Sequence, residues 1–277
     1  KRLFHEIGCV ACHAPRDDQG TELPSPGLRS LAHLPQKYSN TSLAAFLFSP
    51  HKARPSGRMP DFQLSAEEAR DLSTYLMGPN ANAAKPLQVR KELSAKGGQY
   101  FRQFNCLACH SLKGEPVAKP SIPLAELRAG KGCLSKNPKG VPGYDLSDMQ
   151  RKAITQALAK PGEKMSANDQ IKMALTRFNC IACHSRDGYG GPSKELLPYL
   201  GTSQEGLGNH ARIPPGLTLA GAKLKPGWMH KVLFDGEVAR PYMHTRMPGF
   251  GEANLGFLPA LLAVVDKVEP AVFPEPG

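Results

Sequence analysis

The sequence has no long apolar run, which argues against a membrane-spanning protein. No stretch of its 277 residues approaches the roughly 18 consecutive apolar residues of a spanning helix. Hydrophobic residues make up only 40% of the chain, which is lean for a protein that fills several cores with side chains alone. Glycine and proline number 27 and 26, but they lack the period of collagen. This composition favours a soluble globular protein whose cores contain something besides side chains.

The seven cysteines form three pairs and leave one over. Each pair belongs to a Cys-x-x-Cys-His motif, at residues 9–13, 106–110 and 180–184, and each motif follows a short segment with helical spacing. One motif per roughly 90 residues suits one small domain per motif. We therefore predict three consecutive repeats, at residues 1–80, 81–165 and 166–277, the last with a proline-rich tail.

A longer series recurs in the first and third repeats. Leu-Phe, Arg-Pro and Arg-Met-Pro follow one another in the same order over residues 47–60 and again over residues 233–248. Pro-Gly-Leu also occurs in both, at residues 26–28 and 215–217. The order of these segments predicts that the first and third repeats share one fold.

Helices close the repeats. Ser65 and Glu68 have the spacing of a capping box, and Gly78-Pro79 ends the helix that they begin. Ser147 stands at the matching position of the second repeat, and an apolar run over residues 258–265 ends the third. Strand signals are weak throughout, so we predict an all-α fold.

The motif carries a chemistry that explains all its fixed residues. The two thiols add to the vinyl groups of haem as thioethers, and the adjacent histidine becomes an axial ligand of the iron. A disulfide gives no reason for the histidine, and zinc sites join Cys-x-x-Cys units in pairs, which leaves one of three over. We therefore predict three haem c groups, attached at Cys9, Cys12, Cys106, Cys109, Cys180 and Cys183, with iron ligands His13, His110 and His184.

Each repeat resembles a class I cytochrome c domain, closely in the first and third and partly in the second. The shared pattern is a helix, Cys-x-x-Cys-His, a looping middle, a Met-Pro loop and a closing helix. The resemblance implies three small helical domains, each around one covalently bound haem c. It also implies that Met59 and Met247 are sixth ligands of iron. Methionine is often core filler, and Met243 and His244 are rivals to Met247, but the repeated Arg-Met-Pro favours Met59 and Met247.

The second repeat lacks this methionine. Val141-Pro142 stands where the first repeat has its Met-Pro pair, and no methionine lies between His110 and Met149. The loop holds instead Cys133, which we expect to be the sixth ligand, because a lone thiol in an oxidising compartment is a liability unless protected. The alternatives are a buried free thiol at Cys133, with iron bound by Met149, Met165, a lysine or nothing. Thiolate ligation would lower the potential of this haem, whereas thioether ligation raises the other two.

Most of the excess positive charge lies in the second repeat. The chain has a net charge of +11, and residues 81–165, with 15 basic and 6 acidic side chains, account for +9 of it. Such a surface favours docking of an acidic redox partner or attraction of an anionic substrate. Basic and aromatic residues do not interleave as in nucleic-acid-binding proteins.

Together these features predict a tri-haem electron carrier that works between redox partners in the periplasm or at the cell surface. The chain opens at Lys1 without the apolar segment of a signal peptide, so we expect that any such peptide has been removed. Two alternatives stay open. One is an enzyme, similar to a thiosulfate dehydrogenase, that oxidises an anionic sulfur compound at a His/Cys-ligated second haem. The other is an electron-transfer module of a larger polypeptide.

Overall fold

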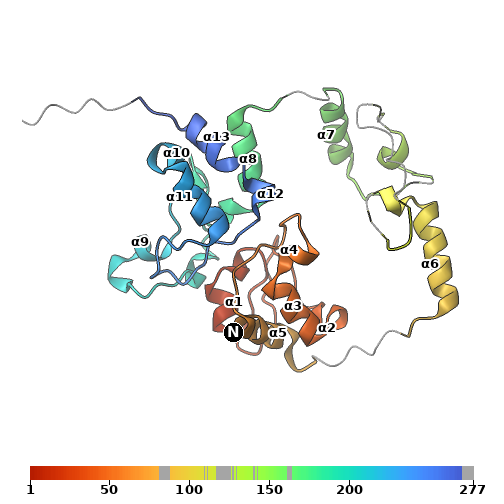
Figure 1. The fold of residues 1–277 in the computed structure, drawn as a ribbon, viewed down its shortest axis with the longest axis horizontal. Helices are drawn as coiled ribbons and strands as arrows, with labels where there is room; N and C mark the ends of the chain where they lie inside the picture. The colour runs from red at the N-terminus through yellow and green to blue at the C-terminus, as the bar shows by residue number, and fades with distance from the viewer. Residues whose placement is uncertain are drawn as a thin grey trace, which may run out of the picture. The chain divides into compact units, whose positions relative to one another are not determined.

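The computed structural model describes residues 1–80, 88–108, 110, 112–116, 126, 128, 130–139, 141, 143–160 and 164–269. These residues form two compact units (Figure 1). The first, here the paired unit, contains the described residues of 1–85 and 165–277, and the second, here the middle unit, contains those of 86–164. The first and third repeats thus share one compact unit. The division into three domains stays a prediction, and the proline-rich tail over 270–277 lies outside the described residues.

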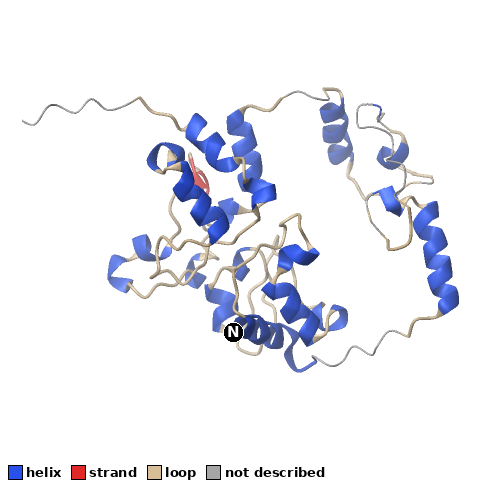
Figure 2. Cartoon of the chain, viewed as in Figure 1, coloured by secondary structure: helices blue, strands red, loops and turns tan. Residues whose placement is uncertain are grey.

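Helices dominate the first repeat (Figure 2). Its elements are α1 (Arg2–Glu6), the 3-10 turn η1 (Cys9–Ala11), α2 (Leu34–Lys37), α3 (Asn40–Phe48), α4 (Pro50–Ala53), α5 (Ala66–Met77) and η2 (Gly78–Asn80). The predicted capping box is confirmed at α5: the Ser65 hydroxyl accepts from the backbone N–H of Glu68, and the Glu68 carboxylate accepts from that of Ser65.

The third repeat is also mostly helical, with one short hairpin. Its elements are α8 (Ala167–Arg177), η6 (Cys180–Ala182), β1 (Ser185–Arg186), β2 (Tyr189–Gly190), η7 (Leu197–Tyr199), η8 (Glu205–Leu207), α9 (Asn209–Arg212), α10 (Ala220–Lys223), α11 (Pro226–His230), the π-helical turn η9 (Lys231–Asp235), α12 (Glu252–Leu255) and α13 (Leu258–Val265). The strands pair antiparallel, with Ser185 opposite Gly190. This largely helical structure fits the predicted all-α class. None of the described helices is both long and apolar enough to cross a membrane.

Two apolar cores stabilise the paired unit. The first is centred on the packing of α1, α3 and α5 around Phe4 and Leu72, and it also takes in Leu196 and Leu200 from the third repeat. The second lies around Ile171 and joins α8 to α11, α12 and α13. Because the first core draws side chains from both repeats, burial of apolar surface holds the repeats together.

A buried ion pair ties the third motif to the end of its repeat. Arg186, just after the motif, donates through Nη1 to Oδ2 of Asp266 at 3.0 Å and to the carbonyl of Leu217 at 2.8 Å. The N–H of Gly221 donates to the same carboxylate at 2.8 Å. Burial opposes the charge on Asp266, but the hydrogen bonds from Arg186 and Gly221 hold the pKa of Asp266 below its ordinary value. The α13 end is thereby fixed beside the haem-motif segment.

The two Arg-Met-Pro loops pair with each other through their backbones. The N–H of Asp61 donates to the carbonyl of Gly249 at 2.8 Å, and the N–H of Gly249 donates to that of Asp61 at 2.7 Å. Both residues lie two positions after the methionine of their loop. The two loops therefore meet at equivalent positions of their repeats.

Two further close approaches join the loops to the other repeat. The side chain of Gln63 lies so near Gly236 that a β-carbon at position 236 would overlap it. Gly251, which is equivalent to Gln63, faces His51, whose ring would be 3.6 Å from a β-carbon. When the Leu-Phe segments of the two repeats are aligned, His51 corresponds to the residue just after Gly236. The loop after each Arg-Met-Pro thus packs against the segment that follows Leu-Phe in the other repeat.

The described residues of the middle unit form two helices and two short turns. They are α6 (Lys91–Gln103), η3 (Cys106–Ala108), η5 (Gly132–Leu134) and α7 (Asp148–Leu158). A capping box at Ser147 begins α7, as at Ser65. Neither helix, both lying wholly among the described residues, has a buried side chain. The buried apolar side chains of the described middle unit are Leu107 and Leu134, far fewer than in the paired unit.

An ion pair clamps the third repeat's loop to the first repeat. Arg246, which precedes Met247, makes two hydrogen bonds to the carboxylate of Glu68, one of them 3.0 Å from Nη1 to Oε2. The backbone N–H of Arg246 also donates to the carbonyl of Ile7 at 3.1 Å. The hydrogen bond from Arg246 lowers the pKa of Glu68. Glu68 thus caps α5 and also binds Arg246 of the third repeat.

This ion pair gives a pH-dependent prediction. Because the folded-state pKa of Glu68 is lowered, its stabilisation is present above the ordinary carboxyl pKa of about 4.3 and is lost as the pH falls through the folded value. Glu68→Gln keeps a residue suited to the capping box but removes the charge. We expect it to lower the free energy of unfolding by about 0.5–1 kcal/mol at neutral pH and by less in acid, measured by denaturant titration.

The matched control is Glu67→Gln, which removes an exposed charge from the same helix turn. It should leave the free energy of unfolding nearly unchanged. An equal loss for Glu68→Gln at neutral and acid pH would show that the carboxylate charge is not what holds the loop.

Candidate haem sites

The three motifs share one backbone turn. In each, the histidine N–H donates to the carbonyl of the motif's first cysteine, at 3.0 Å for His13, 2.9 Å for His110 and 2.9 Å for His184. The residue before the first cysteine has a positive φ in every repeat, at Gly8 (115°), Asn105 (54°) and Asn179 (55°). This left-handed residue ends the preceding helical segment and starts the tight turn that carries the cysteines.

The motif histidines of the paired unit are oriented by backbone carbonyls. Nδ1 of His184 lies 2.7 Å from the carbonyl oxygen of Pro215, and Nδ1 of His13 lies 3.3 Å from that of Arg29. A carbonyl can only accept, so Nδ1 carries the proton and Nε2 keeps its lone pair for a metal. Both carbonyls lie in or beside the repeated Pro-Gly-Leu segments. The recurrence of Pro-Gly-Leu was the sequence signal for this contact, but the sequence did not predict that the segment accepts a hydrogen bond from the motif histidine.

Burial favours the form of histidine that binds metal. It lowers the pKa of His13 and of His184, so the neutral imidazole is preferred. A metal ligand must be in this neutral form. Tautomer and protonation state therefore both fit an axial ligand of iron.

The cysteines of the two motifs are free thiols. Burial raises the pKa of Cys9 to about 12 and the pKa values of Cys180 and Cys183 to about 11. Cys12 is also a free thiol. Two unpaired thiols followed by an oriented, neutral histidine are the donor set that covalent haem attachment requires. The residues present therefore fit haem c.

The candidate methionine ligands lie in the two paired loops. Met59 is half-buried and packs against the first core, whereas Met247 is 42% exposed. Of the rivals to Met247, His244 lies 3.5 Å from the carboxylate of Glu6 through Nδ1, and Met243 is half-buried. The assignment of Met59 and Met247 as iron ligands stays a prediction.

The middle motif is described in part. Cys106 and His110 have the shared turn, and the ring of Phe101 lies 6.3 Å from that of His110, but Cys109 lies outside the described residues. Cys133 is half-buried on η5, which Arg151 of α7 holds through a 2.8 Å hydrogen bond to the carbonyl of Leu134. Cys133 as sixth ligand stays a prediction.

The alternative methionines differ in position. Met149 on α7 is 79% exposed. Met165 falls in the paired unit, where its carbonyl accepts from the side chain of Gln170 at 3.0 Å. Neither side chain is buried in the middle unit.

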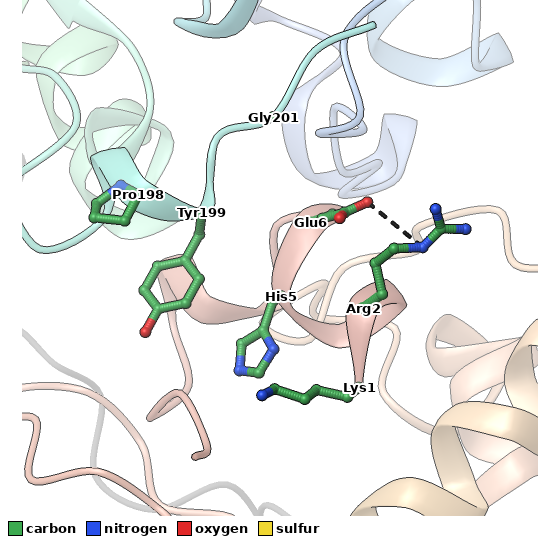
Figure 3. A pocket seen from close by; sticks show the side chains of 7 residues that line it. All are labelled: Lys1, Arg2, His5, Glu6, Pro198, Tyr199 and Gly201. Carbon is green, nitrogen blue, oxygen red and sulfur yellow. Dashed lines mark ion pairs between the residues drawn. The ribbon is translucent and has the colours of Figure 1, made fainter. Parts of the chain in front are cut away.

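A separate hollow of about 500 Å³ lies between α1 and the segment 198–201 (Figure 3). The ring of His5, which is buried, stacks on that of Tyr199 with centroids 5.3 Å apart, and its Nε2 accepts from the N–H of Arg16. None of the residues that line the hollow belongs to a Cys-x-x-Cys-His motif. It is therefore distinct from the haem-attachment segments.

Comparison with protein families places the first repeat. Residues 1–78 match the family model described as Cytochrome c, and this match spans the first motif, Met59 and α5. Comparisons with curated proteins and with solved structures gave no match. Residues 1–78 are therefore a cytochrome c domain, which implies covalently bound haem c and haem-based electron transfer.

Proposed function

We propose that the chain is a tri-haem c-type cytochrome that passes electrons between redox partners outside the cytoplasm. The observation that carries this proposal is the repeated histidine geometry. His184 has the same turn, the same neutral form and the same Nδ1–carbonyl bond as His13, which lies in the cytochrome c domain. The third repeat thus reproduces the supporting contacts of a domain that binds haem.

The chain's residues would hold three haems in the same way. The cysteine pairs would attach the porphyrins, and His13, His110 and His184 would each bind an iron. Met59 and Met247 would supply a neutral sulfur ligand, and Cys133 would supply a thiolate in the middle repeat. Bound haem provides a one-electron Fe(III)/Fe(II) couple, and the protein sets its potential and excludes water.

The low apolar burial among the described residues of the middle unit supports a haem there. Large apolar side chains on and beside α6 are exposed, with Leu93 at 54%, Tyr100 at 55% and Phe104 at 45%. Helices of this kind are stabilised by burying an apolar face. A porphyrin is a large apolar body, so its attachment at Cys106 and Cys109 would supply the missing core.

The charge of the middle repeat supports docking of an acidic redox partner. Lys131, Lys136 and Lys139 surround Cys133 in the sequence and are exposed. Lys136 has an ion pair with Asp148 at 3.1 Å. Clusters of one sign of charge speed the encounter with an oppositely charged partner. A periplasmic or cell-surface location agrees with the usual setting of cytochrome c domains.

The first experiment counts haems. Intact mass and a pyridine haemochrome assay on the mature protein should give three covalently bound haems per chain. The double variant Cys180→Ala, Cys183→Ala should give two, because the third attachment site is lost. Two or fewer haems in the native chain would contradict the tri-haem proposal.

The second experiment tests the sixth ligands. Met59→Leu and Met247→Leu each keep an apolar side chain but remove the sulfur. Each should weaken the sulfur-to-iron charge-transfer absorption of the ferric protein and lower one midpoint potential by at least 59 mV, a tenfold change for a one-electron couple. Cys133→Ala should raise the lowest potential and alter one low-spin electron paramagnetic signal.

Met173→Leu is the control, because Met173 is an exposed methionine on α8. It should change neither the absorption nor any potential. Three unchanged low-spin signals in Cys133→Ala would exclude the thiolate ligand. Turnover of thiosulfate by the native protein, abolished by that substitution, would identify an enzyme instead of a carrier.

A further inference from the structure

We propose that Asn179 of the third repeat raises the potential of the first repeat's haem and so sets the direction of electron flow within the paired unit. This inference rests on the proposed function, because it requires haem at both motifs. The hydrogen bond from Asn179 joins two repeats, and the family resemblance does not imply it.

The contact joins the two haem motifs directly. Nδ2 of Asn179 lies 3.2 Å from Sγ of Cys12 and 3.2 Å from the carbonyl oxygen of Ala11. The Ala11 carbonyl can only accept, so it fixes the amide with its NH₂ group toward Cys12. The two hydrogens of that group serve the two acceptors. The sulfur that would carry the first haem is therefore hydrogen-bonded from the residue just before Cys180.

The surroundings hold Asn179 in place. Its backbone N–H donates to the carbonyl of Thr176 at 3.1 Å, at the end of α8. The neighbouring Phe178 is buried against Phe250, with ring centroids 5.2 Å apart. Cys183 packs against the first core, so the third motif meets the first repeat at a second point. The bond is therefore part of the interface that the paired loops build.

The first repeat has no equivalent of this contact. The residue equivalent to Asn179 in the first repeat is Gly8, which has no side chain to donate toward Cys183. A hydrogen bond donated to the thioether sulfur of Cys12 would withdraw electron density from the porphyrin and its iron, which stabilises the ferrous state. It would therefore raise the midpoint potential of the first repeat's haem. The haem of the third repeat would have no equivalent hydrogen bond.

The consequence is a preferred direction of transfer. With haem bound at both motifs, one electron would pass from Fe(II) at the third motif to Fe(III) at the first, which would oxidise the former iron and reduce the latter. No bond would be made or broken, and no proton would move.

The test uses the full haem-loaded chain and a spectroelectrochemical titration. Asn179→Gly removes the donor but keeps a residue that accepts a positive φ, as Gly8 does in the first repeat. We expect it to lower the highest midpoint potential, by up to 59 mV, which is a tenfold change in the one-electron equilibrium. Asn179→Asp replaces the donor by an acceptor and should lower that potential at least as much.

The matched control is Asn105→Gly, the same substitution at the same position of the middle repeat, where φ is also positive. It should leave the highest potential unchanged. Unaltered potentials in Asn179→Gly, with three haems still bound, would overturn this inference and leave the proposed function intact. A native chain that lacks haem at either motif would instead fail the proposed function.

Discussion

The reciprocal hydrogen bonds between Asp61 and Gly249 are the contact on which the paired unit depends. They join equivalent points of two loops that also carry Met59 and Met247, so they place two candidate ligand loops back to back. The Arg246–Glu68 ion pair and the Asn179–Cys12 hydrogen bond lie in the interface that this pairing creates. The shared apolar core, which takes in Leu196 and Leu200, joins the same two repeats.

Within each site, the support of the histidine matters as much as its presence. At His13 and His184 a backbone carbonyl from a later loop holds Nδ1, and so leaves Nε2 as the nitrogen that would bind an iron. The paired unit has this arrangement and two side-chain cores in the described structure. The described residues of the middle unit include few buried side chains, and its fold is accordingly the one that would depend most on a bound porphyrin.

The sequence predicted the local structure well and the long-range contacts poorly. The capping box at Ser65, the matching helix start at Ser147 and the helical character of the chain follow from local patterns, and the structure confirms them. The pairing of Asp61 with Gly249 uses backbone atoms, which leave no trace in residue identity. The contact between Asn179 and Cys12 spans 167 positions and uses a residue type common in left-handed turns. Repeats reveal equivalence along the chain, but they do not reveal which equivalent surfaces meet.

Amide hydrogen exchange of the full haem-loaded chain tests the pairing most directly. The backbone amides of Asp61 and Gly249 should both be protected, because each donates to the other loop. Gly249→Pro, which removes one of the two donors, should lower the protection of Asp61 as well. Exchange of both native amides at the rate of an unstructured loop would contradict the paired arrangement of the first and third repeats.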